Sequence, residues 1–327
     1  MNAVPLLQVT EVRQAFPKPD GGELLVLEGV NLQLLQGQIV GLLGRSGSGK
    51  STLLRLIAGL SEPNAGTVSY LGQQVMGPAP GVAMVFQSFA LFPWLTVFEN
   101  VALGLEAQGL PRAEIRTKTL AAIDLIGLDG FESAYPRELS GGMRQRVGFA
   151  RALVVHPSIL LMDEPFSALD VLTAETLRTD FLDLWSEGRM PIKGVILVTH
   201  NIEEAVLMCD RVLVFGSNPG RILTEIAVPL PQPRNRLDPM FRALVERIYV
   251  EMTARPRAVT GTRNEWFPGL GIGTTLPRVS SNLLSGLIVS RSPVGLSRSF
   301  SSIPLKIHEE VRPHDPTLSC PRCKGSL

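Results

Sequence analysis

The segment from Gly44 to Thr52 constrains this chain more than any other feature. It fits the pattern G-x-x-x-x-G-K-[ST], and an apolar run at 39–43 before it predicts a strand. A helical pattern over 52–58 follows and stops at Gly59. The glycines allow a tight turn whose backbone N–H groups point inward at an anion, and the positive end of the helix adds to that field. We therefore predict a site for a nucleoside triphosphate, and a glycine-rich turn without a ligand is the minor alternative.

Two side chains of this loop have chemical roles in such a site. Lys50 can reach the outer phosphates, and the hydroxyl of Ser51 can ligate Mg²⁺. The predicted nucleotide-binding residues of the loop are Gly44, Arg45, Ser46, Gly47, Ser48, Gly49, Lys50, Ser51 and Thr52.

A second motif lies where a short apolar run at 159–162 ends in two acidic residues, Asp163 and Glu164. The run is typical of a parallel strand that is buried on both faces. A carboxylate at the carboxyl end of such a strand lies beside the phosphate loop in an open α/β sheet. We expect Asp163 to hold Mg²⁺ with Ser51, and Glu164 to polarise the attacking water. Two acids alone would fit a solvated turn, but the phosphate loop in the same chain favours catalysis.

A third motif begins at Ser140 and opens a predicted helix that continues to about residue 153. Serine is a natural N-cap, and Gly141 and Gly142 leave backbone N–H groups bare, so this helix start is a second anion-binding site. One chain thus carries a phosphate loop and a separate helix start that binds phosphate.

With these motifs, the chain resembles the ATP-binding subunit of an ABC transporter over about residues 6–255. The motifs occur in the family's order, and the ordered set is specific although each string alone is weak. They are the Walker A loop at 44–52, the glutamine loop ending at Gln87, the signature at 139–142, the Walker B strand ending at Asp163 and Glu164, the D-loop at 167–170 and the switch histidine His200.

This resemblance implies an α/β fold with the P-loop NTPase core of ABC ATPases, an antiparallel β subdomain and a helical subdomain. The ATPase domain is expected over 1–228, with the helical subdomain at about 88–155 and a helix at 113–126 within it. A C-terminal extension, partly helical, is expected over 229–290. Residues 291–327, rich in serine and proline, are predicted to be a disordered tail.

The resemblance also assigns roles around ATP and Mg²⁺. Glu164 is the expected catalytic base, Gln87 contacts the metal or the attacking water, and His200 contacts the γ-phosphate after a predicted strand at 195–199. Phe16, in the loop after a predicted strand at 7–12, is expected to stack on adenine. An ordinary core aromatic at Phe16 and a structural or surface histidine at 200 are the competing interpretations.

Partners follow from the same resemblance. Ser140, Gly141 and Gly142 are expected to bind the nucleotide of a second ATP-binding subunit, and a head-to-tail homodimer is the expected arrangement. A transmembrane permease is expected to contact the segment 89–97, although its aromatic residues could instead be packed in the core. The segments 92–97 and 216–222 resemble the nitrate, sulfonate and taurine importer branch. In that branch the permease and a solute-binding protein select the solute.

Composition excludes several other classes. The chain has 327 residues, 45% hydrophobic content and a net charge of +1, so it can bury a large core and shows no basic face for nucleic acid. It has no apolar run of about 18 residues and no signal-peptide pattern at its start. We therefore expect a cytoplasmic protein held at the inner face of the membrane by its permease. Only three cysteines occur, which fits a reducing compartment.

The C-terminal region gives weaker signals. Residues 229–234 are predicted to be a linker, and 239–252 an amphipathic helix. A reading-frame shift after about residue 290 is one hypothesis for the unrelated tail, and resequencing of the coding region would test it. Cys320 and Cys323 resemble half of a zinc knuckle, but two free thiols in a solvated tail are favoured because a closed site needs four ligands.

Two other functions compete with import. An ABC-type ATPase can act on ribosomes or DNA ends, but such proteins usually carry two cassettes or a long coiled-coil insertion. Alternatively, the chain binds ATP as a regulatory subunit without hydrolysing it, although Glu164, His200 and the signature argue against this.

Overall fold

The computed structural model describes residues 4–253. Most of the predicted extension, the serine-rich tail and the pair Cys320 and Cys323 lie outside the described residues. Among residues 4–253, no helix combines the length and the apolar character needed to cross a membrane.

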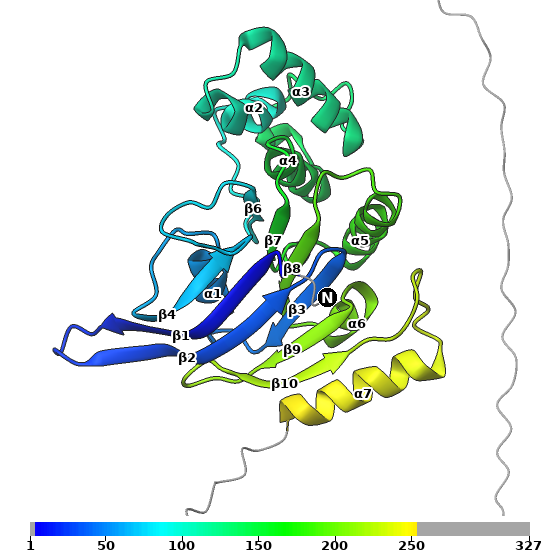
Figure 1. Ribbon diagram of the computed structural model, residues 1–327. Coiled ribbons are helices and arrows are strands. Elements are labelled where there is room, and N and C mark those ends of the chain that lie inside the picture. Colours follow the sequence, from blue (N-terminus) through cyan, green and yellow to red (C-terminus); the bar gives the residue numbers. More distant parts are fainter. Residues whose placement is uncertain (1–3, 254–327) are drawn as a thin grey trace, which may run out of the picture. The chain divides into compact units, whose positions relative to one another are not determined.

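The core of the described part is a six-stranded sheet in the order β10-β9-β3-β8-β7-β6 (Figure 1). All neighbouring strands run parallel except the outer pair β9 and β10, which is antiparallel. The strands are β3 (Gln38–Gly44), β6 (Val82–Val85), β7 (Ile159–Asp163), β8 (Gly194–Thr199), β9 (Arg211–Phe215) and β10 (Ile222–Ala227). The strands that we expected before the phosphate loop, the acidic pair and His200 are therefore present.

The central strands are apolar throughout because both faces of this sheet are covered. On β3, Ile39 and Leu43 belong to the hydrophobic cluster on one face, and Val40 and Leu42 belong to the cluster on the other. Successive side chains of a strand point to opposite faces, so burial of both faces requires an uninterrupted apolar run.

One face of the sheet is covered by helix α1 (Lys50–Ile57) and by a second, antiparallel sheet in the order β2-β1-β4-β5. Its strands are β1 (Leu7–Pro17), β2 (Glu23–Leu34), β4 (Ala65–Tyr70) and β5 (Gln73–Gln74). The prediction that a loop begins after residue 12 was wrong. Irregularities in register between Val9 and Ala15 absorb extra residues, and pairing with β2 then continues to Pro17.

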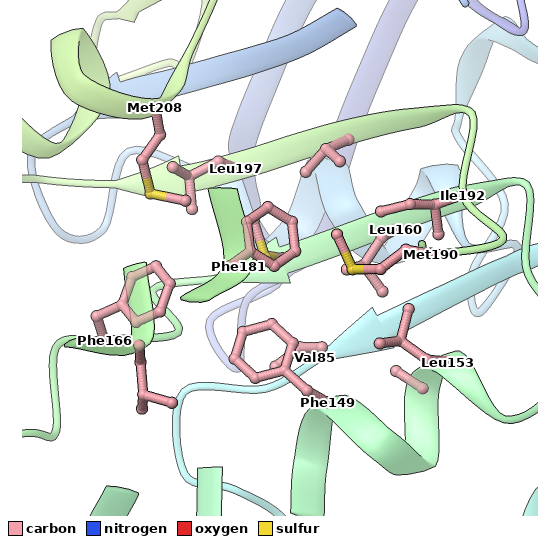
Figure 2. Packing of buried hydrophobic residues seen from close by; sticks show 14 of the residues in the cluster. Val85, Phe149, Leu153, Leu160, Phe166, Phe181, Met190, Ile192, Leu197 and Met208 are labelled. Carbon is pink, nitrogen blue, oxygen red and sulfur yellow. The ribbon is translucent and has the colours of Figure 1, made fainter. Parts of the chain in front are cut away.

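The other face is covered by helices that share one large apolar cluster. Figure 2 shows part of it, including Phe149, Phe166 and Phe181. The ring of Phe149 lies 5.8 Å from that of Phe181 and 6.2 Å from that of Phe166, centroid to centroid. The helices of this cluster are α2 (Val97–Ala107), α3 (Arg112–Leu125), α4 (Gly141–Leu153), α5 (Val171–Ser186), α6 (Ile202–Met208) and α7 (Pro239–Thr253). Of these, α2 and α3 pack mainly on α4 and on each other, beyond the helices that lie on the sheet (Figure 1).

Several of these helices begin where the sequence supplies a capping side chain. Thr96, Ser140, Asp170 and Asn201 each accept a hydrogen bond from the backbone N–H three residues later, at the starts of α2, α4, α5 and α6. Each cap satisfies one of the N–H groups that the first turn of a helix leaves without a partner.

The segment 229–234, which we predicted to be a linker, is fixed to the core by Arg234. Its guanidinium is buried and donates hydrogen bonds of 2.7 Å to the carbonyl oxygens of Val206 and Cys209, at the end of α6. The following helix α7 then packs against α6 and buries Phe241 and Ile248. This part of the expected extension belongs to the same compact unit as the sheet.

A buried ion pair joins α5 to α6. Arg178 donates a hydrogen bond of 2.9 Å to Glu204, and the two side chains are only 9% and 7% exposed. The same guanidinium contacts Glu175 and lies over the ring of Phe166. Removing one partner of a buried pair leaves an uncompensated charge, which costs more than the pair itself contributes.

We therefore expect Arg178→Met to lower the free energy of unfolding by about 3–5 kcal/mol, because Glu204 would stay buried without its partner. Urea unfolding followed by circular dichroism measures this. Arg189→Met is the matched control, since Arg189 pairs with Glu187 on an exposed surface and should change stability little. Equal effects of the two substitutions would contradict the role assigned to the buried pair.

Candidate functional site

The phosphate loop connects β3 to α1 and ends in the first turn of that helix. Gly47 and Gly49 have φ angles of 77° and 93°, a left-handed conformation that glycine adopts at little cost. Gly49 is the N-cap residue of α1. The residues after it therefore present the unpaired N–H groups of a helix start, which favour a bound anion.

Lys50 is buried and its ammonium group is held inside the loop. It donates hydrogen bonds of 2.8 Å to the carbonyl oxygens of Gly44 and Arg45, and it lies 3.3 Å from Oγ of Ser48. Burial lowers the pKa of Lys50 below its usual value, whereas the negative charges of Glu164 and Asp163 act in the opposite direction. A positive group is thus positioned at the loop beside two carboxylates.

A cavity of about 320 Å³ opens over this loop. It is lined by Val26, Ser46, Gly47, Gly49, Lys50, Ser51, Thr52, Gln87 and Glu164. The loop thus lines the same cavity as residues that follow two other strands of the sheet, β6 and β7. A phosphate chain in this cavity would meet backbone N–H groups on one side and the side chains of Gln87 and Glu164 on the other.

The first contact between motifs joins Ser51 to Asp163, whose side chains lie 3.0 Å apart in a hydrogen bond. Ser51 belongs to α1 and Asp163 ends β7, so two strand ends of the parallel sheet bring them together. Burial raises the pKa of Asp163, the hydrogen bond from Ser51 lowers it, and the nearby charge of Glu164 raises it further. A hydroxyl and a carboxylate are oxygen ligands of the kind that hard cations prefer.

The second contact between motifs gathers Glu164, His200 and Gln87. Nδ1 of His200 lies 3.0 Å from Oε2 of Glu164, and Nε2 of Gln87 lies 3.4 Å from the same oxygen. Gln87 also donates to Oγ of Ser167 at 3.2 Å. These residues follow β6, β7 and β8, which are neighbours in the sheet.

The backbone of Glu164 is unusual. Its φ angle is 46°, a left-handed conformation that costs a non-glycine residue energy, and its N–H donates to the carbonyl oxygen of Val198 on β8. The side chain is 14% exposed, whereas that of His200 is 53% exposed. The carboxylate is therefore held at a fixed place beside the cavity, with the imidazole on its solvent side.

The other predicted site residues lie apart from this group. Phe16 is within β1, opposite Leu24 of β2, and it is 42% exposed. Ser140 caps α4, its Oγ accepting from the N–H of Met143 at 3.2 Å. Gly142 is buried against Thr173 of α5, where an added Cβ would lie 2.4 Å from a methyl carbon. Within residues 4–253, neither Phe16 nor the 140–142 segment is part of the cavity lining.

The structure adds two residues that had no predicted role at the cavity. Val26 of β2 lines the cavity, and Ser167 contacts Gln87 while its Oγ donates to the carbonyl oxygen of Glu164 at 2.9 Å. Val26 belongs to an ordinary strand pattern, so nothing in the sequence marked it. Ser167 is the first residue of the predicted D-loop, and its contacts with Gln87 and Glu164 are what the structure adds.

Comparisons with known proteins agree with this geometry. Residues 27–167 match the family model described as ABC transporter. The chain is 45% identical over 234 residues to the nitrate import ATP-binding protein NrtD of Synechocystis sp., which covers 70% of this chain and 86% of that protein. It is 43% identical to the bicarbonate transport ATP-binding protein CmpC of Synechococcus elongatus over 70% of this chain, but it spans only 35% of that longer protein.

Solved structures show the same fold. The dimeric structure of the ATP-binding cassette MJ0796 in a post-hydrolysis state with ADP and Pi is 31% identical and has a TM-score of 0.61. The match covers 69% of this chain and all of that one. The expected α/β fold of an ABC ATPase is thus confirmed, and so is the expected family: this chain belongs to the ATP-binding proteins of ABC transporters.

Proposed function

We propose that this chain is the ATP-hydrolysing subunit of an importer for nitrate or a related small anion. The observation that carries the proposal is the meeting of two groups at the phosphate-loop cavity. Ser51 and Asp163 form one group, and Glu164, His200 and Gln87 form the other. A base and its orienting partners beside a phosphate site are the parts that phosphoryl transfer to water requires.

The proposed chemistry follows from this geometry. The N–H groups at the start of α1 and the ammonium of Lys50 bind and orient the β- and γ-phosphates of ATP. A water molecule attacks the γ-phosphorus, Glu164 takes its proton, and the bond to the β-phosphate oxygen breaks to give ADP and phosphate. Gln87 and His200 hold the water and the γ-phosphate in line. Ser51 and Asp163 would hold Mg²⁺, which when bound neutralises phosphate charge.

The remaining predicted residues belong to the proposed dimer. The MJ0796 cassette is dimeric, and a head-to-tail arrangement of two copies would bring the α4 start of one copy, with Ser140, Gly141 and Gly142, to the nucleotide of the other. The N–H groups of that helix start suit the γ-phosphate.

We propose that Phe16, half exposed at the far end of β1, stacks on adenine.

The proposed partner is a transmembrane permease that holds the protein at the inner face of the membrane. Phe92 and Trp94 lie in the segment that we expected to contact it, and they are 42% and 69% exposed. Their ring centroids are 5.5 Å apart, so they form one exposed aromatic surface. Nitrate is favoured as the solute because NrtD is a nitrate import protein, and the permease and a solute-binding protein would select it.

Lys50→Ala should weaken ATP binding by about ten- to a hundredfold, because it removes a charged donor from the phosphates. Isothermal titration calorimetry with the full chain measures the dissociation constant for ATP. Lys118→Ala is the control, since Lys118 pairs with Glu114 on the surface of α3 and should leave affinity unchanged. Retained affinity in the Lys50 variant would contradict the phosphate-loop role.

Glu164→Gln should lower kcat for ATP hydrolysis by about 10²–10⁴-fold, because the amide cannot accept the proton of the attacking water. ATP affinity should persist, and an ATP-bound dimer should accumulate. Phosphate release and light scattering with ATP measure the two effects. Glu187→Gln, on an exposed turn, is the matched control. Hydrolysis at the normal rate in the Glu164 variant would mean that the base is misassigned.

The importer itself is tested by co-purification from the native cell. We expect a permease to be recovered with the chain, and ATP hydrolysis by the complex to rise when a loaded nitrate-binding protein is added. Recovery of ribosomes or DNA ends in place of a permease would favour a non-transport ATPase. A permease complex that responds to another loaded solute-binding protein would change the solute only.

A further inference from the structure

The loop between β9 and β10, residues 216–221, has no part in the proposed chemistry. Its sequence is GSNPGR, and the N–H of Gly216 donates to the carbonyl oxygen of Arg221 at 2.8 Å, which closes the loop. It follows β9, the strand that pairs with β3 directly before the phosphate loop. The loop therefore lies beside the phosphate loop without lining the cavity.

Gly220 ties this loop to β2. Its N–H donates to the carbonyl oxygen of Val26 at 2.8 Å, and its carbonyl oxygen accepts from the N–H of Glu28 at 3.0 Å. The two hydrogen bonds form an isolated parallel bridge between Gly220 and Leu27. Val26 lines the phosphate-loop cavity, so this bridge fixes one part of the cavity wall.

The same glycine also packs against the backbone of the phosphate loop at Ser48. A Cβ built on Gly220 would lie 2.1 Å from the carbonyl oxygen of Ser48 and 2.9 Å from that of Val26. Both atoms are backbone, so neither can turn away as a side chain would. Gly49, the N-cap of α1, is also confined, because its Cβ would lie 2.7 Å from a methyl carbon of the buried Leu27 side chain. The phosphate loop is thus enclosed between β2 and Gly220.

We infer that Gly220 is a positioning residue for nucleotide binding. Its backbone fills the space behind Ser48 and fixes Val26, and it thereby holds the phosphate loop in the conformation that presents N–H groups to the phosphates. The inference rests on the proposed binding of ATP at this loop. Tight sites depend on such supporting contacts, because a displacement of about 1 Å weakens several hydrogen bonds at once.

The test is Gly220→Ala in the full chain, with ATP as the probe. Contact with two backbone oxygens forces the phosphate loop to shift, and we expect the dissociation constant and KM for ATP to rise about tenfold or more. At saturating ATP, kcat should stay within about threefold of the wild-type value, because Glu164, Gln87 and His200 follow other strands. A loss of stability alone would not produce this split between KM and kcat.

Gly216→Ala is the matched control in the same loop. The atoms nearest to its Cβ would be in the side chain of Leu223, which is half exposed and can move. ATP affinity should therefore stay at the wild-type value. Equal affinities of the Gly220 variant and the wild type, or equal losses in both loop variants, would overturn the inference. Failure of Lys50→Ala to weaken binding would instead refute the proposed function.

A measurement on the wild-type chain keeps the inference testable if Gly220→Ala does not fold. Coupling between two sites is reciprocal, so bound nucleotide must also stabilise the bridge. Saturating ADP should slow amide hydrogen exchange at Glu28 and Gly220, the two N–H donors of the bridge, as well as within α1. Slowing within α1 alone would show that the loop at 216–221 does not support nucleotide binding.

Discussion

The parallel pairing of β3, β6, β7 and β8 is the constraint on which the rest of this structure depends. Parallel strands end at the same edge of a sheet, so residues that are far apart in the chain meet there. Gln87, Glu164 and His200 follow three of these strands directly or nearly so, and Ser51 follows β3 after the phosphate loop. The aliphatic residues that bury both faces keep these strands in register and so hold the distances between the functional groups.

The charged groups of Lys50 and Asp163 form hydrogen bonds with neutral partners rather than an ion pair with each other. Lys50 is buried and donates to backbone carbonyl oxygens, while Asp163 accepts a hydrogen bond from a neutral hydroxyl. Burial lowers the pKa of the lysine and raises that of the aspartate. The charged form of each group is therefore stabilised when an ion of opposite sign binds nearby. This arrangement suits a site whose ligand carries negative phosphates.

Much of the site could be predicted because its residues belong to short motifs at strand ends. The strands at 39–43, 159–162 and 195–199, and the helix start at Ser140, agree with the structure. The prediction of a loop at Phe16 was wrong because the bulges in β1 are set by its pairing with β2, which no local sequence pattern reveals. Val26, Gly220 and the anchored Arg234 act through contacts between distant segments, and those contacts depend on the whole fold.

The close contact between Gly142 and Thr173 has a mechanical consequence. The helices α4 and α5 touch there with no spare room, since even one added carbon would overlap the threonine methyl group. The start of α4 therefore cannot move closer to the start of α5, and a displacement of α4 in that direction has to push α5 along with it. Ser140 and the D-loop residue Asp170 cap these two helix starts, so a displacement in that direction would move both caps.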